Sequence, residues 1–398
     1  MEKKSSIRRY PKHIAYIEAQ GDDQDYLMFL KFENHYAIPD IDSLIAGAEL
    51  LLNARKKTLV ILTSRKAAPP YTASEDEFVY SFCCQLKDYK TLSKTINKTE
   101  ILSTDLLFEL LDQIAESHSA FKQILVGQIP FDLGLPSEMN QCDVIVPHRG
   151  DNKYLRTALK FLNRIDFTSI YVGIDQTITK DMNELISRYN DVDFYNFSPT
   201  PVGPYVIRNW LIDQGNNPLI FFQDSDDIPC GDRFSTLSAF MHLNNCQMCG
   251  SHELRMDYFK RKLQAVRFPE DVKAALSGAP YFPLLHPTAC ITRKAFYDCG
   301  KLSEERIFGN DTKFLLYSYF VLSSIRNVPE FLYIRKALPG SLTTSPEIML
   351  GSAIRRNLNY QWNCDFQDIK DGLLKREDSN LPPVLSVIPI EKWKCDIN

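Results

Sequence analysis

Between residues 142 and 222 the chain alternates short apolar strands with amphipathic helices, and this rhythm constrains the fold more than any other feature of the sequence. The expected elements, in chain order, are a strand at 142–147, a helix at 151–164, a strand at 170–175, a helix at 179–189, a strand at 192–197, a helix at 206–214 and a strand at 219–222. Strands joined by helices of this length form right-handed βαβ units. The sequence therefore predicts an α/β fold with a mainly parallel (mixed) sheet flanked by helices.

The segment before residue 130 predicts a second, smaller α/β unit. Its expected strands are 13–17, 26–30, 58–62 and 123–126, and its expected helices are 41–52, one that opens at the Ser74–Glu77 capping box, and 106–114. Residues 130–137 are aperiodic and rich in turn residues, which marks a linker and a boundary near Asn140. We therefore expect an amino-terminal domain at 1–135, a central domain at 141–345, and a carboxy-terminal helix (352–362) and tail at 346–398 that pack on the central domain.

Composition excludes several classes of protein. The 398 residues carry a formal charge of −4 and are 44% hydrophobic, which argues against a dedicated nucleic-acid binder and against a disordered chain. The longest apolar-rich run, 314–325, is too short for a transmembrane segment, and residues 1–10 lead into no secretory signal. The ten cysteines have no disulfide-framework spacing, so we expect reduced thiols and a cytoplasmic protein, with peripheral association at the inner membrane face as a further option.

Polar residues gather where the predicted strands end. His148 follows the first strand, Asp175 the second, and Asp224, Asp226 and Asp227 the fourth. Ligands bind beyond the carboxyl ends of parallel strands, so these ends are where a site is expected. Neighbouring carboxylates repel one another unless they share a cation, and hard oxygen ligands suit Mg²⁺ or Mn²⁺. A solvated turn is the alternative, because Asp-x-Asp also occurs elsewhere in this chain.

The motifs at 144–147, 172–175, 208–210 and 221–229 resemble, in order and spacing, the family 2 glycosyltransferases of the GT-A fold. The resemblance covers about residues 142–335. It implies a GT-A-like central domain that binds a nucleotide-sugar donor through Mn²⁺ or Mg²⁺. The roles that it implies are nucleotide binding for Pro147 and His148, a contact to base or ribose for Asp175, a contact near the ribose for Asp224, metal ligation for Asp226 with Asp227 nearby, and electrostatic assistance for Arg208. An exposed arginine at a helix start is the alternative for Arg208.

A second motif lies before the apolar helix expected at 314–325. Family members carry Glu-Asp there, whereas this chain has Asn310-Asp311. The resemblance therefore implies Asp311 alone as the base that accepts the acceptor's proton in an inverting transfer, and a helix cap is the structural alternative.

Taken together, these motifs predict a metal-dependent inverting glycosyltransferase of bacterial-type glycan or glycoconjugate synthesis. Its acceptor would be a glycan, a lipid-linked molecule or a protein, and the amino-terminal domain would recognise that acceptor or a partner. No nucleic-acid partner and no transmembrane segment are expected. A non-catalytic nucleotide-sugar or carbohydrate-binding module and a nucleotidyltransferase are the alternatives.

Three further groups of residues have open interpretations. Cys246 and Cys249, with His252, have part of a zinc spacing but lack a dependable fourth ligand, so buried thiols are favoured. His286 either touches a ligand or packs in a loop. Arg335 and Lys336, placed after a strand expected at 331–334, belong either to a lid over the diphosphate or to a solvated loop.

Overall fold

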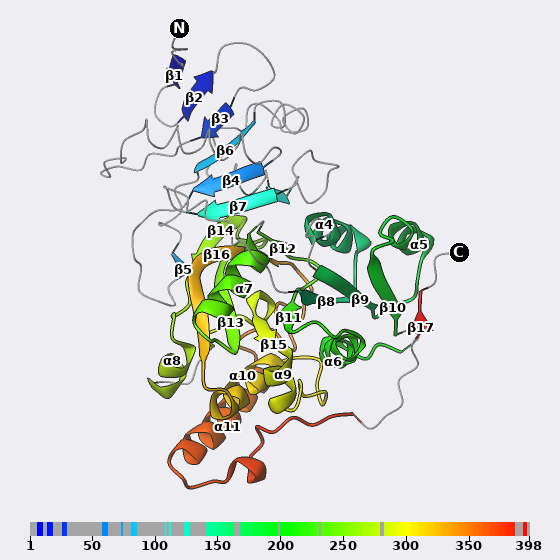
Figure 1. The fold of residues 1–398 in the computed structure, drawn as a ribbon, viewed down its shortest axis with the longest axis vertical. Helices are drawn as coiled ribbons and strands as arrows, with labels where there is room; N and C mark the ends of the chain where they lie inside the picture. The colour runs from blue at the N-terminus through cyan, green and yellow to red at the C-terminus, as the bar shows by residue number, and fades with distance from the viewer. Residues whose placement is uncertain are drawn as a thin grey trace.

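The computed structural model describes strands of the amino-terminal region and most of the chain from residue 141 onward (Figure 1). The described residues are 6–10, 14–18, 26–29, 58–62, 73–74, 81–85, 108, 111–112, 123–127, 141–162, 168–197, 200–230, 232–278, 282–386 and 393–395.

An eleven-stranded mixed sheet forms the central part of the molecule. Its strands are β5 (Ala73–Ser74), β8 (Cys142–His148), β9 (Thr168–Ile174), β10 (Val192–Asn196), β11 (Leu219–Phe222), β12 (Ile228–Pro229), β13 (Met248–Asp257), β14 (Lys262–Val266), β15 (Cys290–Thr292), β16 (Ile325–Ala337) and β17 (Trp393–Lys394). They run in the order β12-β16-β13-β15-β11-β8-β9-β10-β17, with β14 beside β13 and β5 beside β14. The four strands β11, β8, β9 and β10 are mutually parallel. The predicted fold class, a mainly parallel but mixed sheet flanked by helices, is confirmed.

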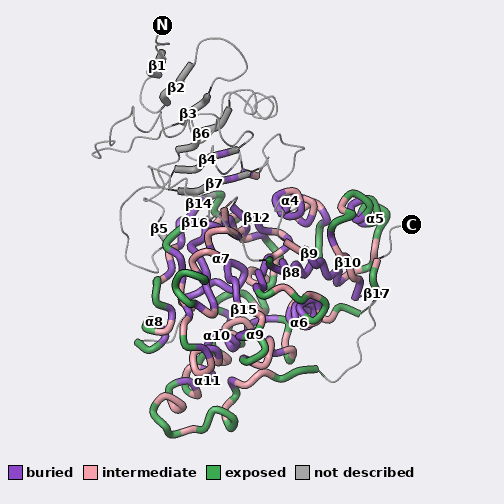
Figure 2. The backbone as a smooth tube through the Cα atoms, viewed as in Figure 1, coloured by how far each residue is buried: buried purple, intermediate pink, exposed green. Residues whose placement is uncertain are grey.

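Both faces of the parallel strands are covered, which explains their continuous apolar sequences. Val144 and Val146 of β8 belong to the core cluster that contains residues of α4 and α5, whereas Ile145 belongs to the cluster that contains residues of α6. Figure 1 accordingly shows α4 and α5 on one side of these strands and α6 on the other, and Figure 2 shows the strands as buried. The described helices are α4 (Asn152–Leu162), α5 (Lys180–Ile186), α6 (Pro204–Gln214), α7 (Arg233–Leu243), α8 (Val272–Gly278), α9 (Arg293–Asp298), α10 (Asn310–Val321) and α11 (Ala353–Lys370).

The later elements differ most from the sequence-based expectation. Helix α10 begins and ends four residues before the expected 314–325, because Gly309, with φ of +77°, lets the chain turn into the helix there. Strand β16 covers thirteen residues instead of the expected 331–334. Helix α11 begins after the Ser352 cap but continues to Lys370, eight residues beyond the expected end.

The strands of the amino-terminal region form a separate six-stranded sheet in the order β1-β2-β3-β6-β4-β7. These strands are β1 (Ser6–Tyr10), β2 (Ile14–Glu18), β3 (Tyr26–Phe29), β4 (Thr58–Leu62), β6 (Ser81–Gln85) and β7 (Gln123–Gly127). The helix expected at 41–52, the helix after Ser74, most of 106–114 and the linker at 130–137 lie outside the described residues; Ser74 itself ends β5. The proposed domain boundaries stay a prediction.

The two parts of the chain touch at Tyr258, in the turn between β13 and β14. Its hydroxyl donates to Asp112 Oδ1 at 2.6 Å, and its ring packs edge-on against Phe108. The Arg261 guanidinium lies over the same Phe108 ring, 5.5 Å from its centre. Residues from the amino-terminal region therefore pack on the β13–β14 hairpin. Among the described residues, no helix is long and apolar enough to span a membrane.

Candidate functional site

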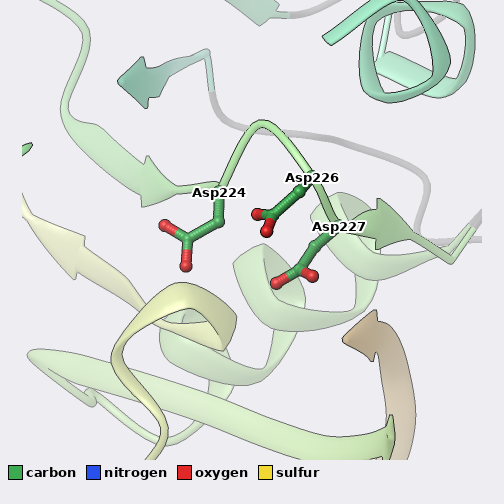
Figure 3. A group of neighbouring side chains, drawn as sticks. All are labelled: Asp224, Asp226 and Asp227. Carbon is green, nitrogen blue, oxygen red and sulfur yellow. The ribbon is translucent and has the colours of Figure 1, made fainter. Parts of the chain in front are cut away.

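The aspartates of the 224–227 loop lie at the carboxyl end of β11, where the chain turns into β12 (Figure 3). One carboxylate oxygen from each of Asp224, Asp226 and Asp227 lies within 4.8 Å of those of the other two. Asp227 is buried, whereas Asp224 and Asp226 are half-buried. Within the described residues this is the single cluster of three or more His, Cys, Asp or Glu side chains that could hold a metal ion.

Gln223 holds the loop in shape from the end of β11. Its side-chain amide donates to the carbonyls of Asp224 and Asp227, at 2.8 and 3.2 Å. Its carbonyl oxygen accepts from Arg233 Nη1 at 2.7 Å. The Tyr333 hydroxyl accepts from the Asp224 amide, so that strand β16 also fixes the loop. Neither Gln223 nor Arg233 was singled out from the sequence, and the contacts that reveal them arise only in the fold.

The cluster carries an unfavourable concentration of negative charge. Burial, together with repulsion from Asp224, raises the pKa of Asp226 to about 6. Burial and repulsion from Asp226 and Asp224 raise the pKa of Asp227 well above its ordinary value, although its carboxylate accepts a 2.7 Å hydrogen bond from the Lys336 main-chain amide. A cation bound between these carboxylates would relieve both effects.

Helix α6 connects this cluster with Asp311. Arg208 Nη2 forms an ion pair with Asp224 Oδ1 at 2.5 Å, and one turn earlier the Tyr205 hydroxyl donates to Asp311 Oδ1 at 2.9 Å. Side chains three residues apart share one face of a helix, so one face of α6 reaches both carboxylates. Arg208 is 6% exposed, so the alternative of an exposed arginine at a helix start is wrong.

Asn310 has a structural role beside Asp311. Its side-chain amide donates to the carbonyls of Ser303 and Arg306, at 2.7 and 2.8 Å, and is fully buried. It therefore closes the loop before α10, and a carboxylate could not make these two donations. Asp311 lies in the first turn of α10, whereas the cap position is Gly309, so the cap interpretation of Asp311 is wrong.

His148 and Asp175 lie side by side at the ends of β8 and β9. The Asp175 amide donates to the His148 carbonyl at 2.8 Å. The His148 ring is buried, its Nε2 pairs with Asn152 Oδ1 and its Nδ1 with the Ser225 hydroxyl. Burial lowers the pKa of His148 to about 4, so the neutral ring accepts from Ser225 and anchors the middle of the acidic loop.

Asp175 supports the start of α6. Its two carboxylate oxygens accept from the backbone amides of Val202 and Gly203, at 2.8 and 3.0 Å. Pro147 lies within β8, opposite Gly173 of β9 in the ladder. The structure thus brings Pro147, His148 and Asp175 together at the carboxyl ends of β8 and β9. The hydrogen bond between His148 and Ser225 connects these strand ends to the acidic loop.

Arg335 and Lys336 belong to neither a lid nor a solvated loop, so both interpretations are wrong. Both residues lie inside β16, opposite Arg255 and Met256 of β13. Their backbone pairs with β13 within the sheet, and the main-chain amide of Lys336 donates to Asp227 of the acidic loop.

Two other open groups are packed residues. The buried His286 ring lies in a short 3-10 helix and packs against Phe222, with ring centres 4.0 Å apart and the rings tilted by 36°; a ligand contact by His286 stays a prediction. Cys246 and Cys249 are buried free thiols, and with His252 they form no candidate metal group among the described residues.

No family model and no curated protein matches this chain. Among solved structures, it is similar to TarS 1-349 from S. aureus in complex with UDP-GlcNAc, with 19% identity, 57% of this chain and 72% of that chain covered, and a TM-score of 0.46. It is also similar to the mannosyltransferase PcManGT from Pyrobaculum calidifontis in complex with GDP-Man and Mn²⁺, with 12% identity, 70% and 73% covered, and a TM-score of 0.43.

Proposed function

We propose that the chain is a metal-dependent inverting glycosyltransferase, which moves a sugar from a nucleotide-sugar donor to an acceptor hydroxyl. The observation that carries the proposal is the acidic loop after β11, joined through one face of α6 to the separate carboxylate of Asp311. A cation-binding cluster and a distinct carboxylate are the two groups that such a transfer needs.

The residues fit a divalent cation. Asp226 and Asp227 offer hard oxygen ligands, and burial together with repulsion between the carboxylates of the loop raises the pKa of both carboxyls, which a bound cation would oppose. One Asp227 oxygen is used by the Lys336 amide, which leaves the other for a ligand. A bound Mn²⁺ or Mg²⁺ would stabilise the negative charge that develops on the departing diphosphate.

The other residues have roles that follow from their positions. Pro147, His148 and Asp175, at the neighbouring strand ends, would line the nucleotide pocket, and Asp224 would face the ribose. Arg208 would hold Asp224 in place through their ion pair. Asp311 would accept the proton of the acceptor hydroxyl, and the Tyr205 hydroxyl orients its carboxylate.

The first experiment measures thermal stability with UDP-, GDP-, TDP- and CMP-sugars, with and without Mn²⁺. A ligand that binds only the folded protein stabilises it by about 2.7 kcal/mol at a hundred times its Kd. We expect one donor class to raise the melting temperature in a Mn²⁺-dependent manner, and Asp226→Ala to abolish the Mn²⁺-dependent part. Asp298→Asn, which removes a surface carboxylate paired with Lys294, is the control and should respond like the wild type. A panel with no Mn²⁺-dependent shift would contradict the proposal.

The second experiment separates catalysis from binding. Asp311→Asn should keep the donor-dependent shift and lose transfer and donor hydrolysis. Turnover retained in this variant would refute the base assignment. Donor binding by the wild type without transfer or slow hydrolysis would instead identify a non-catalytic binding module.

The acceptor class and the amino-terminal domain complete the proposal. A domain at 1–135 would recognise the acceptor, whether glycan, lipid-linked or protein, or a partner, and the domain at 141–345 would carry the chemistry in the cytoplasm. The hydrogen bond between Tyr258, in the β13–β14 turn, and Asp112, from the amino-terminal region, supports an association of the two parts. Loss of acceptor use with retained donor hydrolysis is the expected result when residues 1–135 are removed and a lysine is placed on β14, which loses its partner β5 in this variant.

A further inference from the structure

Lys336 is a buried ammonium group beside the acidic loop. The residue is 3% exposed, and its Nζ has no hydrogen-bond partner among the described residues. Its Nζ lies over the Tyr154 ring, 5.3 Å from the ring centre. An unpaired buried charge is costly, so its position next to three carboxylates calls for an explanation.

The charges around this ammonium come from three parts of the chain. Asp226 and Asp227 attract it from the acidic loop and Asp112 attracts it from the amino-terminal region, whereas Lys153 of α4 repels it. Of the three loop carboxylates, Asp224 already pairs with Arg208. Arg335 also interacts electrostatically with the carboxylates of the acidic loop, but its ion pair is with Glu253 of β13. Among the described residues, Lys336 is therefore a cation that interacts with Asp226 and Asp227 while its Nζ has no hydrogen-bond partner.

This arrangement opposes the binding of a divalent ion alone. A metal held by Asp226 and Asp227 would be repelled by the neighbouring ammonium, and the repulsion is little screened at a buried position. A diphosphate that arrives with the metal brings negative charge and hydrogen-bond acceptors for the free Nζ–H groups. The two carboxylates and the ammonium together carry one net negative charge, a divalent metal alone turns this into one net positive charge, and a diphosphate removes that excess.

We propose that Lys336 is a positioning residue for the donor's diphosphate, and that it couples metal binding to donor binding at this site. The inference rests on the proposed function, because it takes the acidic loop as the metal site. In the absence of donor, the ammonium offsets one of the two negative charges of Asp226 and Asp227 and so weakens binding of the metal. In the presence of donor, it binds the diphosphate and holds it against the metal.

The test measures two affinities by calorimetry, that of Mn²⁺ alone and that of the Mn²⁺–pyrophosphate complex. In Lys336→Met, which keeps the stem beside Tyr154, we expect Mn²⁺ alone to bind about tenfold tighter and the complex about tenfold weaker. Lys336→Gln should move both affinities in the same directions. Lys336→Arg should return both to within about threefold of the wild type, because the charge is restored. Lys294→Met, which removes an exposed lysine, is the control.

Opposite changes in the two affinities separate this role from a structural one. A variant whose fold is damaged would lose both affinities together. Both affinities weakened, or both unchanged, in Lys336→Met and Lys336→Gln would overturn the inference while leaving the proposed function intact. Wild-type protein that binds neither probe would overturn the proposed function, and this inference with it.

Discussion

Replacing Arg233 by Met tests whether this one side chain fixes the end of β11, from which the acidic loop starts. The guanidinium is fully buried and donates to the Phe222 carbonyl at 2.6 Å, the Pro287 carbonyl at 2.8 Å and Gln223 Oε1 at 2.7 Å. It also lies over the Tyr333 ring, 4.9 Å from its centre. Arg233 thus connects the end of β11 with the 3-10 helix at 286–288, which precedes β15.

The substitution leaves three buried acceptors without donors. Each unsatisfied acceptor costs about 1–3 kcal/mol, whereas removal of a buried guanidinium that has no carboxylate partner recovers part of that cost. We expect a net loss of about 3 kcal/mol. For a domain of this size, that loss lowers the melting temperature by about 6–12 °C. Because Gln223 also loses its anchor, binding of Mn²⁺ should weaken.

Thermal unfolding followed by circular dichroism, together with a Mn²⁺ titration, measures both effects. Arg188→Met, which removes an exposed arginine, should melt within about 1 °C of the wild type. A shift below about 2 °C for Arg233→Met would show that water or rearranged side chains satisfy the carbonyls, and would refute the reasoning.

Three further substitutions probe other parts of the site. Because the pKa of His148 is lowered to about 4, the unfolded chain binds the proton first, so stability is full above about pH 6.5 and falls by up to about 3 kcal/mol towards pH 4. Denaturant unfolding of His148→Gln across this window should show a flatter profile, and an unchanged slope would contradict the assignment. Asn310→Asp places a carboxylate against two carbonyls and should cost about 2–4 kcal/mol in denaturant unfolding, whereas a neutral effect would mean that the loop rearranges. Trp362→Ala removes a side chain that is 2% exposed and should cost about 3–5 kcal/mol by the same measurement; a loss below about 1 kcal/mol would show that α11 is not firmly docked.

The parallel strands could be predicted because their pattern is local. Residues 144–147 and 219–222 are apolar on both faces, and helices cover both faces of these strands. The acidic loop was located by the same reasoning, since it follows directly after such a strand. The starts of α5 and α11 were also close to those expected, because their caps, Thr179 and Ser352, are recognised from residues within one turn.

What could not be predicted depends on contacts between distant residues. Lys336 is buried because β16 pairs with β13, where its partner Met256 lies eighty positions earlier. Arg208 was open to an exposed interpretation, yet α6 is buried on most of its surface and pairs this arginine with Asp224. The Tyr205–Asp311 hydrogen bond spans 106 positions. Local sequence patterns do not carry such pairings.

The short strand β5 has a practical consequence for anyone who wishes to produce the second half of the protein alone. Its residues Ala73 and Ser74 hydrogen-bond along β14, opposite Val266 and Ala265. A polypeptide trimmed to start at residue 141 would lack this flanking strand. The backbone amide and carbonyl groups on that side of β14 would then be unpaired, and such groups promote strand pairing between molecules. Self-association of such a fragment would therefore reflect a missing neighbour, and a proline or lysine substitution on β14 would be the remedy to try first.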